Sequence, residues 1–84
     1  MEFNNVIIEK VREILTQHGR LSTSVGEIKD DGDLYNAGLT SLATVSLMLA
    51  LEDEFDVEFP DSMLSRNTFS SIDTIAEAID ELQN

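Results

Sequence analysis

Hydrophobic residues recur at helical spacing near both ends of the chain. In the first stretch, about residues 3–18, they form one stripe that consists of Phe3, Val6, Ile7, Val11, Ile14 and Leu15. In the last stretch they fall at Ile72, Ile75, Ala76, Ile79 and Leu82, and the acidic residues lie largely outside this stripe. Both patterns predict amphipathic helices with one buried face. Gly19 is placed to end the first helix, and Ser70 and Asp73 match a capping box that would begin the last one.

A middle stretch, residues 41–55, predicts a helix with two apolar surfaces. It follows Gly38, which lets the backbone turn, and Thr40, a good N-cap. One contiguous stripe is the expected core face, and its members are Thr44, Leu47, Met48, Leu51 and Phe55. A second cluster lies off that stripe and close to Ser41, and it consists of Leu42, Val45 and Leu49. A single core face does not need this second cluster, which is therefore either additional burial or a docking surface for another molecule.

The segments between these helices carry only short elements. Residues 20–40 should contain a short helical turn, pinned by scattered apolar residues at Leu21, Val25, Ile28, Leu34 and Leu39. Residues 56–60 should be extended because a proline ends this segment. A short helix is expected over residues 61–64, with Phe69 filling the core beside it. The pattern predicts an all-α fold, a small bundle of three main helices and one short helix, as a single domain over residues 1–84.

Composition narrows the function before any motif is considered. There is no cysteine and a single histidine, His18, so neither a catalytic set nor a metal site can be assembled, and the calcium-loop pattern fails across residues 29–33. We therefore expect a protein that is not an enzyme. The formal net charge is −12, and the whole acidic excess lies beyond Gly26. Such a field repels nucleic acid and attracts basic partner surfaces, and the same acidity also keeps a small protein in solution.

Residues 34–51 contain no charged side chain, yet they do not predict a membrane-spanning helix. Asn36, Gly38 and five hydroxyl-bearing side chains interrupt this stretch. Polar and charged residues within the first ten positions also break the apolar core that a signal peptide requires. We therefore expect a cytoplasmic monomer without membrane insertion.

The start of the middle helix is the candidate site for chemistry. Ser41 would lie where several backbone N–H groups lack intrahelical partners and where a phosphate group is electrostatically favoured. It is therefore a candidate phosphate-bearing hydroxyl. The same position also suits an ordinary polar residue of the first helical turn.

Residues 33–59 resemble the acyl and peptidyl carrier protein family. The resemblance rests on Gly-Leu-Thr-Ser-Leu at residues 38–42, on Leu-Glu-Asp-Glu-Phe at residues 51–55 and on the apolar helix between them, and it extends more weakly to Ile79. In that family the serine that matches Ser41 carries 4′-phosphopantetheine, which a phosphopantetheinyl transferase donates from coenzyme A. The terminal thiol of this arm holds the cargo as a thioester. The resemblance thus implies a carrier that presents acyl or aminoacyl cargo to loading and transferring enzymes.

Departures from the family pattern predict a specialised carrier. The residue before the serine is commonly Asp in fatty-acid carriers and is Thr40 here, and two helix positions that are often acidic hold Ala43 and Ser46. We therefore expect a dedicated pathway of acyl, polyketide or aminoacyl transfer in preference to housekeeping fatty-acid synthesis. The expected partner-binding residues are Thr40, Leu42, Val45, Leu49, Glu52 and Asp53.

Two other classes of function fit the residues alone. An acidic helical interaction module would bind a partner through the same surface without any prosthetic group. A helical lipid-binding protein without covalent attachment would need an internal cavity. Covalent modification of Ser41 separates the carrier from both.

Overall fold

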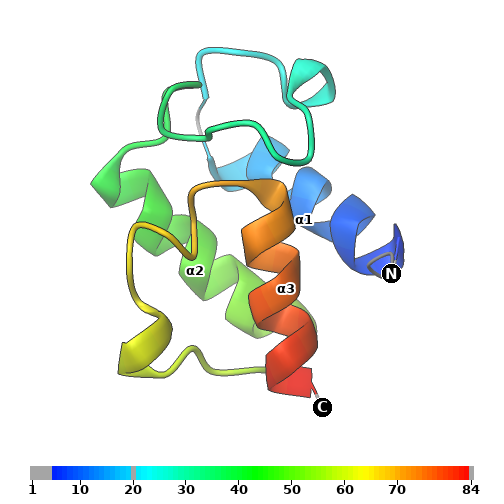
Figure 1. The fold of residues 1–84 in the computed structure, drawn as a ribbon, viewed down its shortest axis with the longest axis vertical. Coiled ribbons are helices and arrows are strands. Elements are labelled where there is room, and N and C mark those ends of the chain that lie inside the picture. Colours follow the sequence, from blue (N-terminus) through cyan, green and yellow to red (C-terminus); the bar gives the residue numbers. More distant parts are fainter. Residues whose placement is uncertain (1–4, 20, 84) are drawn as a thin grey trace.

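Three α-helices and two short 3₁₀-helices form the regular structure of the chain, which is described by a computed structural model over residues 5–19 and 21–83 (Figure 1). In chain order the elements are α1 (Asn5–His18), η1 (Val25–Glu27), α2 (Ser41–Phe55), η2 (Asp61–Met63) and α3 (Ile72–Gln83). The described ranges contain no strand, so the predicted all-α fold with three main helices is confirmed. No helix in these ranges is long and apolar enough to cross a membrane.

The main helices begin and end close to where the hydrophobic pattern placed them. The predicted bounds of α2 are confirmed at both ends, and α1 ends at His18 as expected. The predicted start of the first helix, with Phe3, lies outside the described residues. The predicted short helix over residues 61–64 is a single 3₁₀ turn, because Leu64 already leaves helical angles at φ −87° and ψ 69°.

The predicted conformations at the start of α3 and just after the end of α2 were wrong. The capping box of α3 lies one residue later than predicted, since the Ser71 hydroxyl accepts from the Thr74 amide and the Thr74 hydroxyl accepts from the Ser71 amide, each at 3.1 Å. Asp56 is not extended but left-handed, with φ 54° and ψ 50°, and its amide bonds to the Glu52 carbonyl as the C-cap of α2. Gly19 follows α1, and its amide bonds to the Leu15 carbonyl at 2.8 Å.

The core lies where α1 packs against both α2 and α3. Each main helix contributes large side chains that are almost completely buried, namely Val11, Leu15, Leu47, Leu51, Ile72, Ile75 and Ile79. The connection between α2 and α3 closes a further side, because Phe59 and Phe69 are both buried and their ring centroids lie 5.5 Å apart. The expected core role of Phe69 is confirmed. Each such side chain contributes about 1.5–3 kcal/mol by leaving water.

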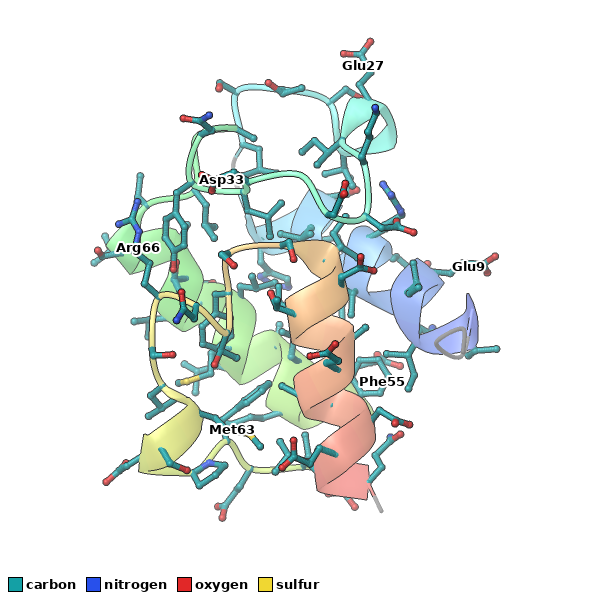
Figure 2. All side chains as sticks on the ribbon, viewed as in Figure 1. Glu9, Glu27, Asp33, Phe55, Met63 and Arg66 are labelled. Atoms are coloured by element: carbon teal, nitrogen blue, oxygen red, sulfur yellow. The ribbon has the colours of Figure 1, made fainter. Side chains whose placement is uncertain are left out.

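The long loop between α1 and α2 is tied to the helices by hydrogen bonds. Arg12 of α1 donates to the carbonyls of Val25 and Ile28, both at 2.9 Å, and to the Asp30 carboxylate. The Leu34 amide bonds to the Ser70 carbonyl at 2.7 Å, next to the start of α3. The labelled carboxylates of Glu9 and Glu27 point outward, away from this framework (Figure 2). The loop that leads to α2 is therefore fixed at several points.

A matched pair of leucine truncations in α2 tests this assignment of the core. Leu47→Ala should lower the free energy of unfolding by about 2–5 kcal/mol, because it opens a cavity at a fully buried position. Leu42→Ala should change it by less than about 0.5 kcal/mol, because this side chain is 85% exposed. Urea titration followed by circular dichroism measures both values. Equal losses for the two variants would show that the two faces of α2 are wrongly assigned.

Candidate functional site

The turn that precedes α2 is rigid because two buried leucines anchor it. Leu34 and Leu39 are 0% and 4% exposed, and the Leu39 amide bonds to the Leu34 carbonyl at 3.0 Å. Directly before Leu34, the Asp33 carboxylate accepts from the Tyr35 amide at 3.0 Å. This pattern is an Asx turn, in which an aspartate side chain replaces a backbone acceptor. This turn therefore fixes the direction in which the backbone enters α2 at Ser41.

The turn requires a glycine at position 38, because of the backbone conformation there and because Ser22 lies close by. Its φ is +113°, a value that residues with a side chain rarely adopt. A Cβ atom at this position would lie 2.9 Å from both the amide nitrogen and the hydroxyl oxygen of Ser22. Ser22 cannot withdraw freely, because its amide and hydroxyl both bond to the Ala37 carbonyl, at 2.9 and 2.8 Å. The expected turning role of Gly38 is thus confirmed.

The first turn of α2 is capped but still presents free backbone donors. The Thr40 hydroxyl accepts from the Ala43 amide at 3.1 Å, and the Thr44 amide bonds to the Thr40 carbonyl at 2.8 Å. The amides of Ser41 and Leu42 have no hydrogen-bond partner among the described residues. No acidic side chain lies in this turn, so the partial positive charge of the helix end is not neutralised locally.

Ser41 is the first residue of α2, and it is exposed. Its hydroxyl makes no hydrogen bond to any described residue. The hydroxyl is therefore accessible to an incoming enzyme, and a phosphate attached to it would lie next to the free amides of the helix end. These properties fit a phosphodiester-linked prosthetic group, which needs an exposed oxygen and gains from nearby N–H donors.

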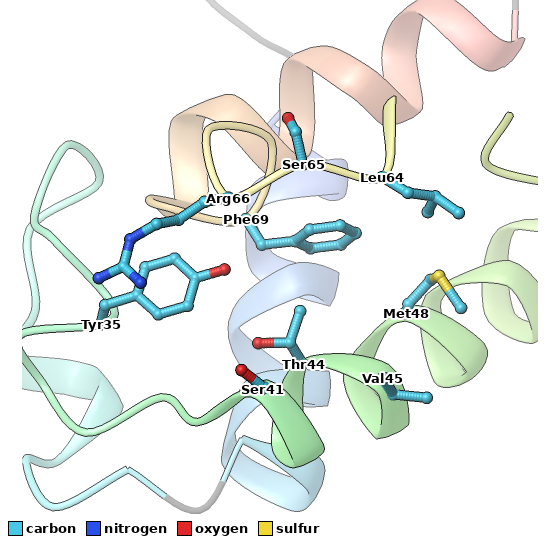
Figure 3. A pocket seen from close by; sticks show the side chains of 9 residues that line it. All are labelled: Tyr35, Ser41, Thr44, Val45, Met48, Leu64, Ser65, Arg66 and Phe69. Carbon is cyan, nitrogen blue, oxygen red and sulfur yellow. The ribbon is translucent and has the colours of Figure 1, made fainter. Parts of the chain in front are cut away.

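A surface groove of about 350 Å³ opens beside Ser41 (Figure 3). It runs between the first half of α2 and the segment before α3, and it is lined by Tyr35, Ser41, Thr44, Val45, Met48, Leu64, Ser65, Arg66 and Phe69. Arg66 stacks on the ring of Tyr35, with its Cζ atom 4.1 Å from the ring centroid. Neither this groove nor the stacked pair was expected from the sequence. The feature of the sequence that points to this site is Arg66, the one basic residue after Lys29 in an acidic sequence.

The second apolar cluster of α2 is exposed to solvent. Leu42, Val45 and Leu49 are 85%, 52% and 56% exposed, so the alternative of additional burial was wrong. Thr40 and Asp53 are exposed as well.

Two further positions of α2, Glu52 and Ala43, already have structural roles in the fold. Glu52 is half-buried, and its carboxylate accepts from the Phe59 amide at 2.9 Å, which gives it a structural task besides any contact with partners. Ala43 is 7% exposed and belongs to the core. A docking carboxylate cannot replace Ala43 without burying a charge.

His18 does not line the groove beside Ser41. It lies at the end of α1 and lines a second groove with Leu49, Asp53 and Glu54, among other residues. In the described part of the chain, no cluster of three or more His, Cys, Asp or Glu residues is placed to hold a metal ion.

The sequence of this chain is similar to those of carrier proteins. The chain matches a family model described as a phosphopantetheine attachment site over residues 6–79. It is 51% identical over 69 residues to an aminoacyl carrier protein of Agrobacterium fabrum, a match that covers 82% of this chain and 83% of that protein.

Solved structures of carrier proteins show the same fold. The carrier protein from Agrobacterium tumefaciens, complexed with an engineered glycine:[carrier protein] ligase of Bradyrhizobium japonicum and ATP, gives a TM-score of 0.86 at 47% identity, over 89% of this chain and 97% of that one. In a structure of the Bradyrhizobium japonicum ligase complexed with glycylated carrier protein, the matching chain gives a TM-score of 0.76 at 26% identity, over 87% of this chain and 97% of that one.

Alanine substitutions at two glycines test the conformation that positions Ser41. Gly38→Ala should lower the free energy of unfolding by about 1–3 kcal/mol, since it combines a left-handed backbone with the contact to Ser22. Gly26→Ala should be neutral or stabilising by up to about 1 kcal/mol, because a Cβ there meets no atom within 4 Å. Urea titration measures both. Tolerance of alanine at Gly38 equal to that at Gly26 would contradict the described turn.

Proposed function

Because this chain belongs to the family of carrier proteins that bear phosphopantetheine, we propose that Ser41 is the serine that carries the prosthetic group. Membership of this family confirms the resemblance seen in the sequence. It makes the chain a carrier and not an enzyme, and it implies a 4′-phosphopantetheine group on a serine. The observation that favours Ser41 is its exposed, unbonded hydroxyl at the first position of α2.

The attachment step uses this hydroxyl as the nucleophile. The Ser41 oxygen attacks the phosphorus of coenzyme A that bears pantetheine, and a base of the transferase takes the hydroxyl proton. A new P–O bond to Ser41 forms, the bond to the bridging oxygen breaks, and adenosine 3′,5′-bisphosphate leaves. The resulting phosphodiester keeps a negative charge beside the free amides of Ser41 and Leu42, an arrangement that contributes about 0.3–1 kcal/mol at an exposed helix end. The group supplies a thiol, which this cysteine-free chain lacks.

The proposed cargo is a small aminoacyl group, loaded by a ligase of the glycine:[carrier protein] kind. Support comes from the 51% identical aminoacyl carrier protein and from the related carriers solved with such a ligase, one of them glycylated. The neutral residues Thr40 and Ser46 also favour this specialised role over fatty-acid synthesis. A test of this preference should introduce acidic residues at these two positions and leave the buried Ala43 unchanged.

We propose a single carrier domain over residues 1–84 that works as a monomer in the cytoplasm.

The exposed leucine and valine cluster of α2 is the proposed docking face for the loading ligase. Leu42, Val45 and Leu49 lie on the helix that begins at Ser41, so an enzyme seated on them would have the attachment point within reach. Burying apolar surface contributes roughly 25 cal/mol per Å², and a few central side chains dominate most interfaces. Thr40 and the exposed carboxylate of Asp53 border this face, and Asp53 would orient a basic partner.

The two alternative functions have less support. An interaction module without a prosthetic group does not account for a match to the attachment-site family over residues 6–79. A lipid-binding protein without covalent attachment needs an enclosed cavity, whereas the hollow beside Ser41 is a groove at the surface.

Incubation with coenzyme A and a phosphopantetheinyl transferase, followed by intact-mass measurement, tests the attachment site. The wild-type chain should gain the mass of one phosphopantetheinyl group, and Ser41→Ala should gain none. Ser46→Ala is the matched control, because it removes another exposed serine of α2 and should be modified like the wild type. Modification of Ser41→Ala, or an unmodified wild-type chain, defeats the proposal.

Alanine variants of the docking face, prepared with the arm already attached, test ligase recognition. Leu42→Ala and Leu49→Ala should each reduce kcat/KM for glycine loading about tenfold, which corresponds to ~1.4 kcal/mol of lost contact. Val6→Ala is the control, since it truncates a side chain of α1 that is 63% exposed. The docking face is wrongly placed if all three variants are loaded equally fast.

A further inference from the structure

Arg66 is distinctive among the basic residues because of what surrounds it. It is the one charged side chain among the described residues that line the groove beside Ser41. Lys10 pairs with Glu13 and Glu54, and Arg12 pairs with Asp30. Arg66 and Lys29 pair with no carboxylate of the described residues, although the chain carries a formal charge of −12, and of these two only Arg66 lines the groove. An unpaired guanidinium in so acidic a protein is available to an anion.

Tyr35 holds this guanidinium at the groove without using its hydrogen bonds. The Cζ atom of Arg66 lies 4.1 Å from the centre of the Tyr35 ring, and Figure 3 shows the group over the ring. Stacking of this kind uses the flat face of a guanidinium, whereas its N–H donors point outward in the plane. Tyr35 is itself fixed, since its amide donates to Asp33 and its carbonyl accepts from Gly38, at 3.0 and 3.1 Å. Tyr35 thus belongs to the turn that precedes Ser41, and Arg66 packs against this turn from the segment between η2 and α3.

We propose that Arg66 binds the phosphodiester formed on Ser41 and acts as a positioning residue for the prosthetic arm. This inference rests on the proposed function, because it requires the phosphate to be attached at Ser41. Both residues line one groove, and a guanidinium can hold two phosphate oxygens at once through parallel N–H donors.

The charge distribution strengthens the inference. Between Leu34 and Leu51 no side chain is charged, so residues 35–50 contain no counter-ion for a new phosphate. The acidic surface as a whole repels the added negative charge. Arg66 reaches the groove from the segment between η2 and α3, so it supplies the missing positive charge from a different part of the fold (Figure 2). An arm held at its phosphate by Arg66 leaves the protein in a narrower range of directions than one attached through Ser41 alone.

Phosphorus NMR of the modified protein tests the contact directly. Arg66→Gln should shift the phosphodiester resonance relative to wild type, and Arg66→Lys, which keeps the charge, should restore part of the wild-type position. Lys29→Gln is the matched control, because it removes the same charge from an exposed position that does not line the groove. Raising the ionic strength should move the wild-type resonance toward that of Arg66→Gln, since salt screens an exposed ion pair.

Melting temperatures of the unmodified and modified forms provide a second measurement. Unmodified Arg66→Gln should melt a few degrees below the unmodified wild type, because it loses the contact with the Tyr35 ring. After modification the difference between Arg66→Gln and wild type should widen by about 2 °C, the size expected for one surface ion pair in a domain of this length.

The outcomes separate this inference from the proposal that precedes it. A chain that gains the mass of the arm but shows the same phosphorus resonance in wild type, Arg66→Gln and Lys29→Gln overturns the role of Arg66 alone. An equal shift in Arg66→Gln and Lys29→Gln also overturns it, because net charge would then explain the effect. A wild-type chain that gains no mass overturns both the attachment site and the phosphate contact.

Discussion

The functional surface depends on how α2 is anchored at its N-terminal end. Leu34 and Leu39 are buried on either side of a tight turn, and Leu47 and Leu51 fix the same helix further along. These four buried leucines therefore determine where Ser41 and the free amides beside it point. Ser41 needs no packing partner of its own, because the residues before and after it supply the rigidity.

Because α2 is anchored through one face only, its other face remains exposed to solvent. Leu42, Val45 and Leu49 keep more than half of their surface in water, which is unfavourable for the isolated chain. In a domain of this size the core has little stability to spare, so burying these side chains internally would have been an accessible way to gain it. Their exposure beside the proposed attachment site supports the proposal that a partner enzyme covers them, with one side of α2 serving stability and the other serving recognition.

Periodicity predicted the elements of this fold well, because helix formation depends mainly on the spacing of apolar residues. It placed both ends of α2 and the buried positions Leu47 and Leu51 correctly. It could not place the α3 cap, since Ser70 and Ser71 both offer a hydroxyl. The Asp73 amide, which a cap at Ser70 would need, bonds instead to the Asp30 carbonyl at 2.9 Å, and this long-range bond is not visible in the local sequence. The left-handed Asp56 was missed for a similar reason, because aspartate tolerates that region without requiring it.

The site was predictable only in part, and the limit lies in long-range contacts. Ser41 could be put forward as the attachment residue because its place in the helix and the surrounding motif both favour it. The stacking of Arg66 on Tyr35 joins residues 31 positions apart in the chain, and no local pattern specifies it. The burial of Ala43 and the structural bond of Glu52 likewise depend on what the tertiary fold places next to them.

Charge and apolar contact have separate tasks on this surface. The acidic excess acts over about one Debye length, ~8 Å at physiological ionic strength, and favours encounter with any basic enzyme. It cannot by itself select one partner, because the face next to Ser41 carries no charge from Leu34 to Leu51. With the proposed docking face, selection would come from short-range fit to Leu42, Val45 and Leu49, which governs how long an encounter lasts more than how often it occurs. In this proposal the carrier meets many enzymes, and only an enzyme with a complementary apolar surface stays bound long enough to act on its thioester.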